Sequence, residues 1–322
     1  MINKEVEGQK PFISVIIDAH DRKEFLKDAI ESAINQSIDR SIYEIIVVKN
    51  FDDPEIDNLI AANQVISVKS SKNSLVGEDL SKGLEISRGE IISFLDDDDK
   101  FQVNKLETIF NIFQKDKEIV YYHNSQQFES VNRYMGPTYK TIKQIYDTKF
   151  LKRSLKHLIS KYTTIPLVFN ISSISVRKAH YIKYAEALKK LANHTDDFFF
   201  FLGLNLDGKY FFDDLPLTIY LRHDSASKAI HKLDSKVDYF ERKHDIHLRG
   251  SIATDYILSL VNDSKLKNLL KAHKQFEFFS SKIYNQDMDM KLFIQCVINS
   301  RYYGLKNTMV EFYLLLKDIV KA

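Results

Sequence analysis

The chain contains little cysteine and no long apolar run, and these absences exclude several classes of protein. One cysteine, Cys296, stands among 322 residues, so neither an intrachain disulfide framework nor a cysteine-based metal cluster can form. No apolar run approaches the length of a membrane-spanning helix, and the polar segment Met1–Lys10 lacks the apolar core of a signal peptide. We therefore expect a cytoplasmic protein.

The chain also lacks an excess of charge of either sign. Its 46 basic and 44 acidic residues create no overall positive field, so we expect no nucleic-acid partner. Glycine is absent from the turn Asp18–Arg22 after the first predicted strand, where a P-loop or a dinucleotide-binding site needs a glycine-rich phosphate loop. This absence weighs against a nucleotidyltransferase or phosphotransfer enzyme, which stays as a weaker alternative.

Strand and helix patterns alternate at short spacing through the first 122 residues. Mostly apolar, β-branched runs indicate buried strands, and segments with an apolar stripe indicate helices. The expected strands lie near residues 12–17, 44–48, 65–69, 90–95 and 118–122, and the helices near 25–34, 54–62, 79–87 and 103–114. Such alternation predicts βαβ units, and therefore an α/β fold whose mixed, mainly parallel sheet is flanked by helices.

Four consecutive aspartates, Asp96–Asp99, follow the apolar strand that begins at Glu90. In an open α/β sheet, ligands bind beyond the carboxyl ends of the strands, which is where these side chains are expected. Adjacent like charges repel one another, and a hard divalent cation that takes carboxylate and phosphate oxygens would relieve that repulsion. A solvated acidic loop is the alternative interpretation of the same run.

Several segments together resemble one enzyme family. The order of Ile13–Arg22, Ala29–Gln36 and Glu44–Val48 resembles the opening of the family-two inverting glycosyltransferases of the GT-A fold. Lys82–Asp99 resembles the family's second signature, a helix ending in Arg-Gly-Glu before the strand that carries the metal-binding carboxylates. The resemblance covers residues 11–228. It implies transfer of a sugar from a nucleotide-diphosphate donor, with a UDP-sugar favoured, to a hydroxyl of a glycan or lipid-linked acceptor.

The resemblance assigns a divalent metal, Mn²⁺ or Mg²⁺, to the acidic run. Asp98 matches the residue that binds the metal, and Asp96 is the other half of the Asp-x-Asp pair. Asp99 is expected only to cap the helix that follows. Arg222 and His223 match the closing loop near the diphosphate, where a cation offsets the charge on the leaving group. His223 is a candidate metal ligand, with a purely structural histidine as the alternative.

The resemblance also assigns the residues that bind the donor. Asp97 matches the residue that reaches the ribose, and Arg22 ends the first matching segment. His20 stands where the family has a tyrosine beside the base, and Asn50 where it has an aspartate that accepts a hydrogen bond from the base. Asp18 replaces a small hydroxyl residue. These departures keep open a catalytically inactive nucleotide-sugar-binding module, and ordinary turn chemistry at the strand ends.

A second acidic site is expected in Asn193–Phe201, which resembles the family's acidic pair followed by an aromatic helix. By that match Asp197 is the general base, and Asp196 or His194 orients it. A general base needs a partly desolvated carboxylate, and the four phenylalanines that follow are suitable walls. Helix capping by either aspartate is the alternative explanation of the pattern.

The remaining segments predict how the molecule is divided and what it contacts. Residues 1–228 are expected to form the GT-A domain, with a nucleotide-sugar half at 11–125 and an acceptor half at 126–228. The basic segment 140–161 predicts a peripheral contact with the inner face of the membrane, or a solvated helix packed through its leucines. Residues 229–322 predict a C-terminal helical subdomain that covers the acceptor cleft, packs on the sheet or forms a homodimer contact.

Overall fold

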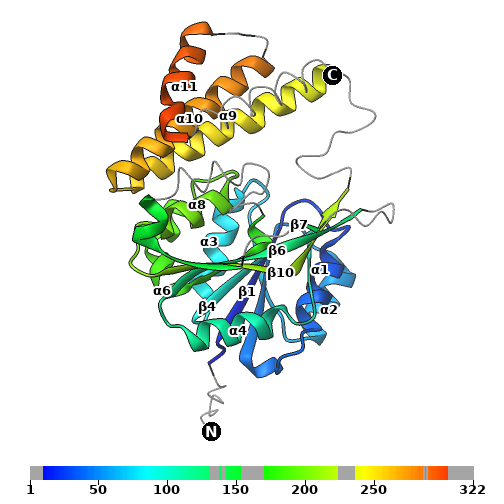
Figure 1. The fold of residues 1–322 in the computed structure, drawn as a ribbon. Helices are drawn as coiled ribbons and strands as arrows, with labels where there is room; N and C mark the ends of the chain where they lie inside the picture. Colours follow the sequence, from blue (N-terminus) through cyan, green and yellow to red (C-terminus); the bar gives the residue numbers. More distant parts are fainter. Residues whose placement is uncertain are drawn as a thin grey trace.

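The computed structural model describes residues 10–130, 138–139, 143–153, 170–223, 236–285, 287 and 289–303. Within these ranges, ten strands form one mixed sheet, with helices on both of its faces and three further helices stacked over one of these helical layers (Figure 1). The order across the sheet is β3-β2-β1-β4-β9-β6-β10-β5. The expected α/β architecture is therefore present.

Four parallel strands form the first half of the sheet: β3 (Ile66–Lys69), β2 (Tyr43–Lys49), β1 (Ile13–Ala19) and β4 (Ile91–Asp96). Every residue of β1 and β2 is buried, as their apolar composition requires of strands covered on both faces. Because these strands are parallel, their carboxyl ends meet at one edge of the sheet, where the acidic residues follow.

The helices between these strands cover opposite faces of the sheet. Three of them pack with Ile13, Val15 and Ile17 of β1, and one packs with Ile16 on the other face. The first three are α1 (Leu26–Ile34), α2 (Pro54–Ala62) and α4 (Lys105–Lys115), and the fourth is α3 (Val76–Ile86). Alternate residues of β1 therefore pack against the helices on the two opposite faces of the sheet.

The second half of the sheet contains strands of both directions. β9 (Ile174–Arg177) runs antiparallel between β4 and the long β6 (Ile119–Ser130), while β10 (Lys209–Arg222) is parallel to β6. The short strands are β5 (Lys100–Phe101) and β8 (Gln144–Asp147), both antiparallel to β10, and β7 (Thr138–Tyr139), antiparallel to β6. The sheet is therefore mixed and mainly parallel.

Short helical elements also connect the strands in both halves of the sheet. They are η1 (Arg40–Ile42) before β2, η2 (Ile171–Ser173) before β9, then α6 (Lys178–Tyr181), η3 (Ile182–Tyr184), α7 (Ala185–Leu188) and α8 (Thr195–Gly203). Residues 148–153 are helical as well. Of these elements, η2 and α8 carry residues of the site.

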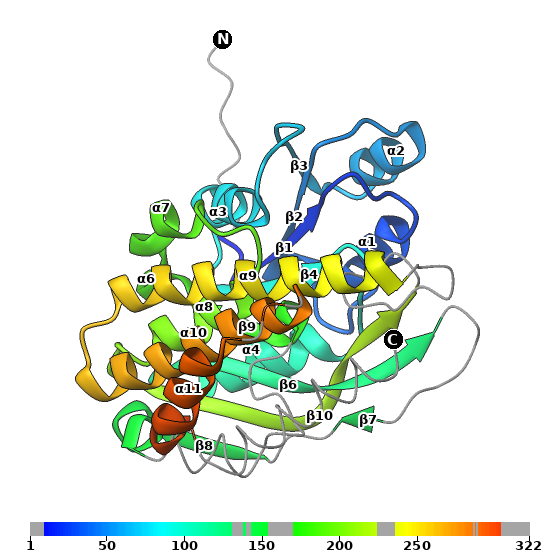
Figure 2. The ribbon, with the colours of Figure 1, turned by 90° about the horizontal axis from the view of Figure 1, so that it is seen from above.

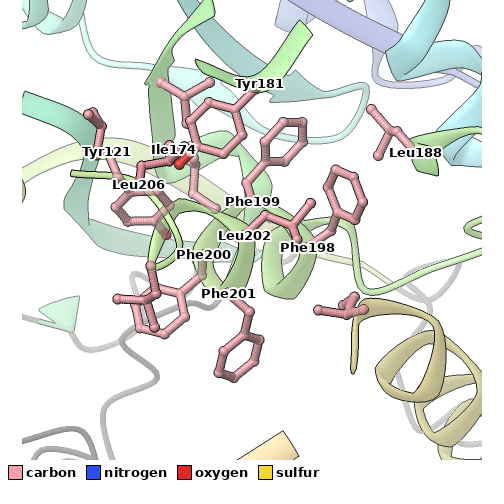
Figure 3. Packing of buried hydrophobic residues seen from close by; sticks show 14 of the residues in the cluster. Tyr121, Ile174, Tyr181, Leu188, Phe198, Phe199, Phe200, Phe201, Leu202 and Leu206 are labelled. Atoms are coloured by element: carbon pink, nitrogen blue, oxygen red, sulfur yellow. The ribbon is translucent and has the colours of Figure 1, made fainter. Parts of the chain in front are cut away.

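Helix α8 is fixed by aromatic packing against the sheet (Figure 3). Its four phenylalanines, Phe198–Phe201, are all buried. Phe199 lies with its ring centroid 4.4 Å from that of Phe94 on β4, and Phe200 meets Tyr121 of β6 edge-on at 5.7 Å. Burial of each large apolar side chain contributes about 1.5–3 kcal/mol. The polar first turn of α8 is consequently held on a rigid base.

Three C-terminal helices follow the sheet: α9 (Lys236–Leu260), α10 (Ser264–Tyr284) and α11 (Met290–Tyr303). Helix α9 lies across α8 in both views (Figures 1 and 2), and Ala253 and Ile257 of α9 belong to the same apolar core as Phe198. Of the three expected roles, packing on the sheet domain is the one seen. The expected boundary at residue 228 lies outside the described residues.

Two predictions from the absences in the sequence can be compared with the described residues. Cys296 is buried on α11 and forms no disulfide. None of the described helices combines the length and the apolar composition that are needed to cross a bilayer.

Candidate active site

Buried carboxylates converge where β1 and β4 end. Asp18 on β1 is the register partner of Asp96 on β4, so the two residues stand side by side at the carboxyl edge of the sheet. Only 8% of Asp18 is exposed. Its burial, and then the charges of Asp97 and Asp79, raise the pKa of Asp18 well above its ordinary range. The surrounding protein therefore offsets only part of the negative charge at the carboxyl ends of β1 and β4.

The acidic run itself forms a compact group of oxygen atoms. Carboxylate oxygens of Asp96, Asp98 and Asp99 all lie within 4.8 Å of one another. Burial and then the neighbouring Asp98 raise the pKa of Asp96 well above its usual range, and raise that of Asp99 to about 7. This set of hard oxygen donors, short of positive charge, fits a divalent cation such as Mg²⁺ or Mn²⁺.

Asp98 contacts two basic side chains, those of Arg22 and His223. Arg22 Nη2 lies 2.7 Å from Asp98 Oδ2, and the same guanidinium donates from Nε to Asp97 Oδ1 at 3.1 Å. His223 Nε2 lies 2.9 Å from Asp98 Oδ2, and the Phe25 ring packs on the imidazole at 4.3 Å. The structure thus brings together four residues that the resemblance selected from three distant segments.

Asp97 is buried against the same arginine. Burial raises the pKa of Asp97 to about 6, although Arg22 opposes this increase. Arg222, the other arginine expected near the diphosphate, ends β10, but its side chain lies outside the described residues. Within the described side chains, Arg22 is therefore the arginine that contacts the acidic run, and it lies between Asp97 and Asp98.

Asp99 does not cap the following helix, so that expectation is wrong. Its carboxylate accepts hydrogen bonds from Asn170 Nδ2 at 2.6 Å and from the backbone amide of Leu221 at 3.1 Å. Helix α4 begins after Asn104 instead, without a side-chain cap. Asp99 is completely buried and joins the end of β4 to η2 and β10.

His20 follows β1 and Asn50 follows β2, and the two residues lie together at the carboxyl edge of the sheet. Asn50 Oδ1 accepts a hydrogen bond from the Asp21 backbone amide at 2.8 Å, and Asn50 Nδ2 donates to Asp21 Oδ1 at 3.0 Å. Asp21 has a positive φ of 55°, which an aspartate tolerates in a turn. Asn50 therefore stabilises the turn after β1.

Asp79, which no local sequence pattern indicates as a site residue, lies beside His20. Asp79 is fully buried on α3, accepts hydrogen bonds from Ser70 and from Ser74 Oγ at 3.0 Å, and lies 3.8 Å from His20 Nδ1. Lys82 Nζ is 3.7 Å away. Because acidic residues are common in first helical turns, nothing in the local pattern separated Asp79 from an ordinary surface residue.

A second acidic site occupies the start of α8. His194 Nδ1 lies 2.9 Å from Asp197 Oδ2, and the Asp197 amide donates to Asp196 Oδ1 at 3.0 Å. His194 is the N-cap residue and has a φ of 57°, in the left-handed region. Capping does not explain Asp197, because both aspartates lie inside the first turn. The three predicted residues therefore form one group.

This second site carries a protonated imidazole. Burial works against the charge on His194, but Asp197 and then Asp196 outweigh it, raising the pKa of His194 to about 9. At neutral pH a cationic imidazole then faces Asp197, whose side chain is 18% exposed. A partly exposed carboxylate held in one orientation is suited to accept a proton from a bound hydroxyl.

Comparison with protein families and curated proteins gives consistent results. The family model described as Glycosyl transferase family 2 matches residues 14–182, which is more than half of the chain. An uncharacterized glycosyltransferase of Haemophilus influenzae is 23% identical over 267 residues, covering 77% of this chain and 85% of the relative. An uncharacterized glycosyltransferase of Methanocaldococcus jannaschii is 27% identical over 188 residues, covering 56% of this chain and 62% of the relative.

Solved structures share the architecture across both the sheet and the C-terminal helices. S. aureus TarS 1–349 in complex with UDP-GlcNAc superimposes with a TM-score of 0.55 at 14% identity, covering 92% of this chain and 89% of that one. This similarity confirms the expected GT-A fold, a mixed and mainly parallel sheet with C-terminal helices. Since the family model covers more than half of its residues, the chain belongs to glycosyl transferase family 2.

Proposed function

We propose that this protein is an inverting, metal-dependent glycosyltransferase. It moves a sugar from a nucleotide-diphosphate donor to a hydroxyl of a glycan or lipid-linked acceptor. The observation that carries the proposal is the pairing of two different acidic sites in a family 2 chain. One is the oxygen cluster at the end of β4, and the other is the carboxylate of Asp197, held by His194 on α8.

The donor half of the proposal rests on the cluster at the end of β4. Asp96 and Asp98 would hold Mn²⁺ or Mg²⁺, with His223 beside them, and the bound metal supplies positive charge to the diphosphate as it leaves. Asp97 would contact the ribose, and Arg22 would add a positive charge beside it. A UDP-sugar is favoured because the TarS structure was solved with UDP-GlcNAc.

The acceptor half of the proposal rests on Asp197. Its carboxylate takes the proton from the acceptor hydroxyl while that oxygen bonds to the anomeric carbon. The bond from the anomeric carbon to the diphosphate oxygen breaks in the same step, and its electrons leave with the nucleoside diphosphate. Attack from the opposite face inverts the anomeric centre, and no covalent intermediate forms. Alignment of both substrates in one cleft supplies much of the rate enhancement.

Thermal unfolding with a panel of nucleotide-diphosphate sugars, with and without Mn²⁺, tests the donor half. We expect a stabilisation that needs donor and metal together, because each offsets the charge of the other at the β4 edge. Asp98→Asn should abolish that stabilisation. Asp207→Asn, at a side chain that is 90% exposed on the surface, is the matched control and should retain it. Failure of every donor to stabilise the wild-type protein would contradict the proposal.

A further inference from the structure

His194 faces the C-terminal helices as well as Asp197. On α9, Gly250 has no side chain, and a Cβ built there would lie 2.8 Å from His194 Nε2 and 2.8 Å from Glu277 Oε2. The two atoms therefore approach one point on the surface of α9 from opposite elements, α8 and α10. Only a glycine leaves this space open.

Glu277 is a buried carboxylate with histidines around it. It is 9% exposed on α10, and its Oε2 lies 2.9 Å from His247 Nδ1 on α9. Burial alone would raise the pKa of Glu277, but the bond from His247 and the charges of His273 and His194 lower it. Glu277 is therefore ionised at neutral pH and presents a negative charge to His194.

His247 is itself fixed by packing. Its ring stacks on Tyr284 with centroids 5.4 Å apart and planes within 6°, and Tyr284 is buried in the apolar core of the C-terminal helices. Acid and imidazole thus alternate from the start of α8 into the C-terminal helices: Asp197, His194, Glu277, His247. Removing one member of this partly buried set leaves its neighbour's charge uncompensated, which is destabilising.

We propose that Glu277, supported by His247, is a positioning residue for glycosyl transfer, holding His194 so that His194 fixes the orientation of Asp197. The C-terminal helices thereby complete the acidic site on α8, in addition to packing on the sheet domain. This inference rests on the proposed role of Asp197 as general base. None of Glu277, His247 and Gly250 needs to touch a substrate.

The proposal makes the active form of the site dependent on pH. The charged groups that act on His194 are Asp196 and Asp197 on α8 and Glu277 on α10, while His247 on α9 and His273 on α10 act on Glu277. The pKa of His194 is raised from 6.5 to about 9. The attraction of charged His194 to Asp197 and Glu277 is therefore fully present below pH 6.5 and is lost as the pH rises through about 9. Glu277→Gln removes one of the negative charges that hold the proton.

Histidine-ring NMR titration and donor hydrolysis, measured on the full chain, test the proposal together. Glu277→Gln should lower the pKa of the His194 ring, which a His194→Gln spectrum assigns among the ten histidines. It should also move the alkaline limit of kcat to lower pH. We expect kcat to fall about two- to tenfold near pH 8.5 and to change little at pH 6. The KM for the donor should be unchanged. Asp255→Asn, which breaks an exposed α9–α10 ion pair with Lys274, is the matched control.

The outcomes separate this inference from the proposed function. An unchanged His194 titration in Glu277→Gln, or an equal loss of kcat at all pH values, would overturn the inference. If the wild-type protein hydrolyses no donor, the proposed function fails, while the NMR titration still decides whether Glu277 holds His194. His247→Gln leaves Glu277 in place and should move the alkaline limit of kcat in the same direction by a smaller amount. If circular dichroism shows that Glu277→Gln is unfolded, His247→Gln takes its place in the test.

Discussion

Single charged residues in this molecule act through their partners rather than alone. Asp98 lies between Arg22 and His223, and Asp99 is tied to Asn170 and the backbone. Consecutive aspartates therefore have separate environments, although the sequence presents them as one run. The partners explain this difference, because His223 and Arg22 contact Asp98, whereas Asn170 and the Leu221 amide donate to Asp99.

The first residue-scale prediction concerns stability and His194. A pKa raised in the folded state stabilises the protein below the ordinary value, and this contribution disappears as pH rises through about 9. Two to three pH units correspond to roughly 3 kcal/mol. His194→Gln should therefore lower the free energy of unfolding most near pH 6, with the difference shrinking toward pH 10, as measured by urea denaturation. A difference that stays constant over this range would contradict the assignment.

At the scale of elements, glycine decides how closely two segments approach. The Arg-Gly-Glu sequence before β4 reads as a helix stop, but the structure gives Gly89 a further role. A Cβ on Gly89 would lie 2.5 Å from the Ser14 backbone nitrogen and 2.7 Å from the Ile13 carbonyl carbon. Because these are backbone atoms of the central strand β1, they have no side-chain freedom with which to move away.

Gly89→Ala should consequently destabilise the sheet domain. We expect a loss of about 2–4 kcal/mol in the free energy of unfolding, since either β1 or the turn before β4 must shift. Lys115→Ala, at an exposed position on α4, is the control and should change stability by less than about 0.5 kcal/mol. Equal stability of the two variants in denaturant titrations would show that the approach of Gly89 to β1 is not required.

The type of secondary-structure element also explains which parts of the fold the sequence predicted well. The strands of the first half are buried on both faces, and such strands have apolar runs that local patterns reveal. The reversed direction of β9 was not predicted, because strand direction depends on connections and not on the composition of Ile174–Arg177. Helix α8 was recognised through its phenylalanines, although its N-cap proved to be His194.

At the scale of the whole molecule, the sequence could predict the parts of the site that are contiguous. Asp96–Asp98 and His194–Asp197 each lie within one short segment, so a motif shows them together. Asp79, Gly250 and Glu277 were missed because their partners come from other elements, and a buried acid or glycine on a helix has no distinctive local spacing. Contacts of this kind require the tertiary structure.

The membrane contact remains a whole-molecule prediction. Within 143–153, the described part of the basic segment, Leu151 is buried, and Lys149 exposes 67% of its side chain. Lys152 lies 4.0 Å from Asp263 at the start of α10. Replacing Lys149, Lys152, Arg153 and Lys156 by alanine should weaken binding to anionic liposomes, because each lost charge removes about 1 kcal/mol of attraction near the surface. Unchanged liposome binding would contradict this contact.

Turnover of a labelled nucleotide-diphosphate sugar by wild-type protein and by Asp197→Asn tests the central claim most directly. The substitution keeps the shape of the side chain and removes its ability to accept a proton. The account predicts that wild-type protein with Mn²⁺ consumes the donor with inversion at the anomeric carbon, and that Asp197→Asn loses about 10²–10⁴-fold in rate while its donor affinity is retained. Equal rates in the two proteins, or retention of configuration, would contradict it.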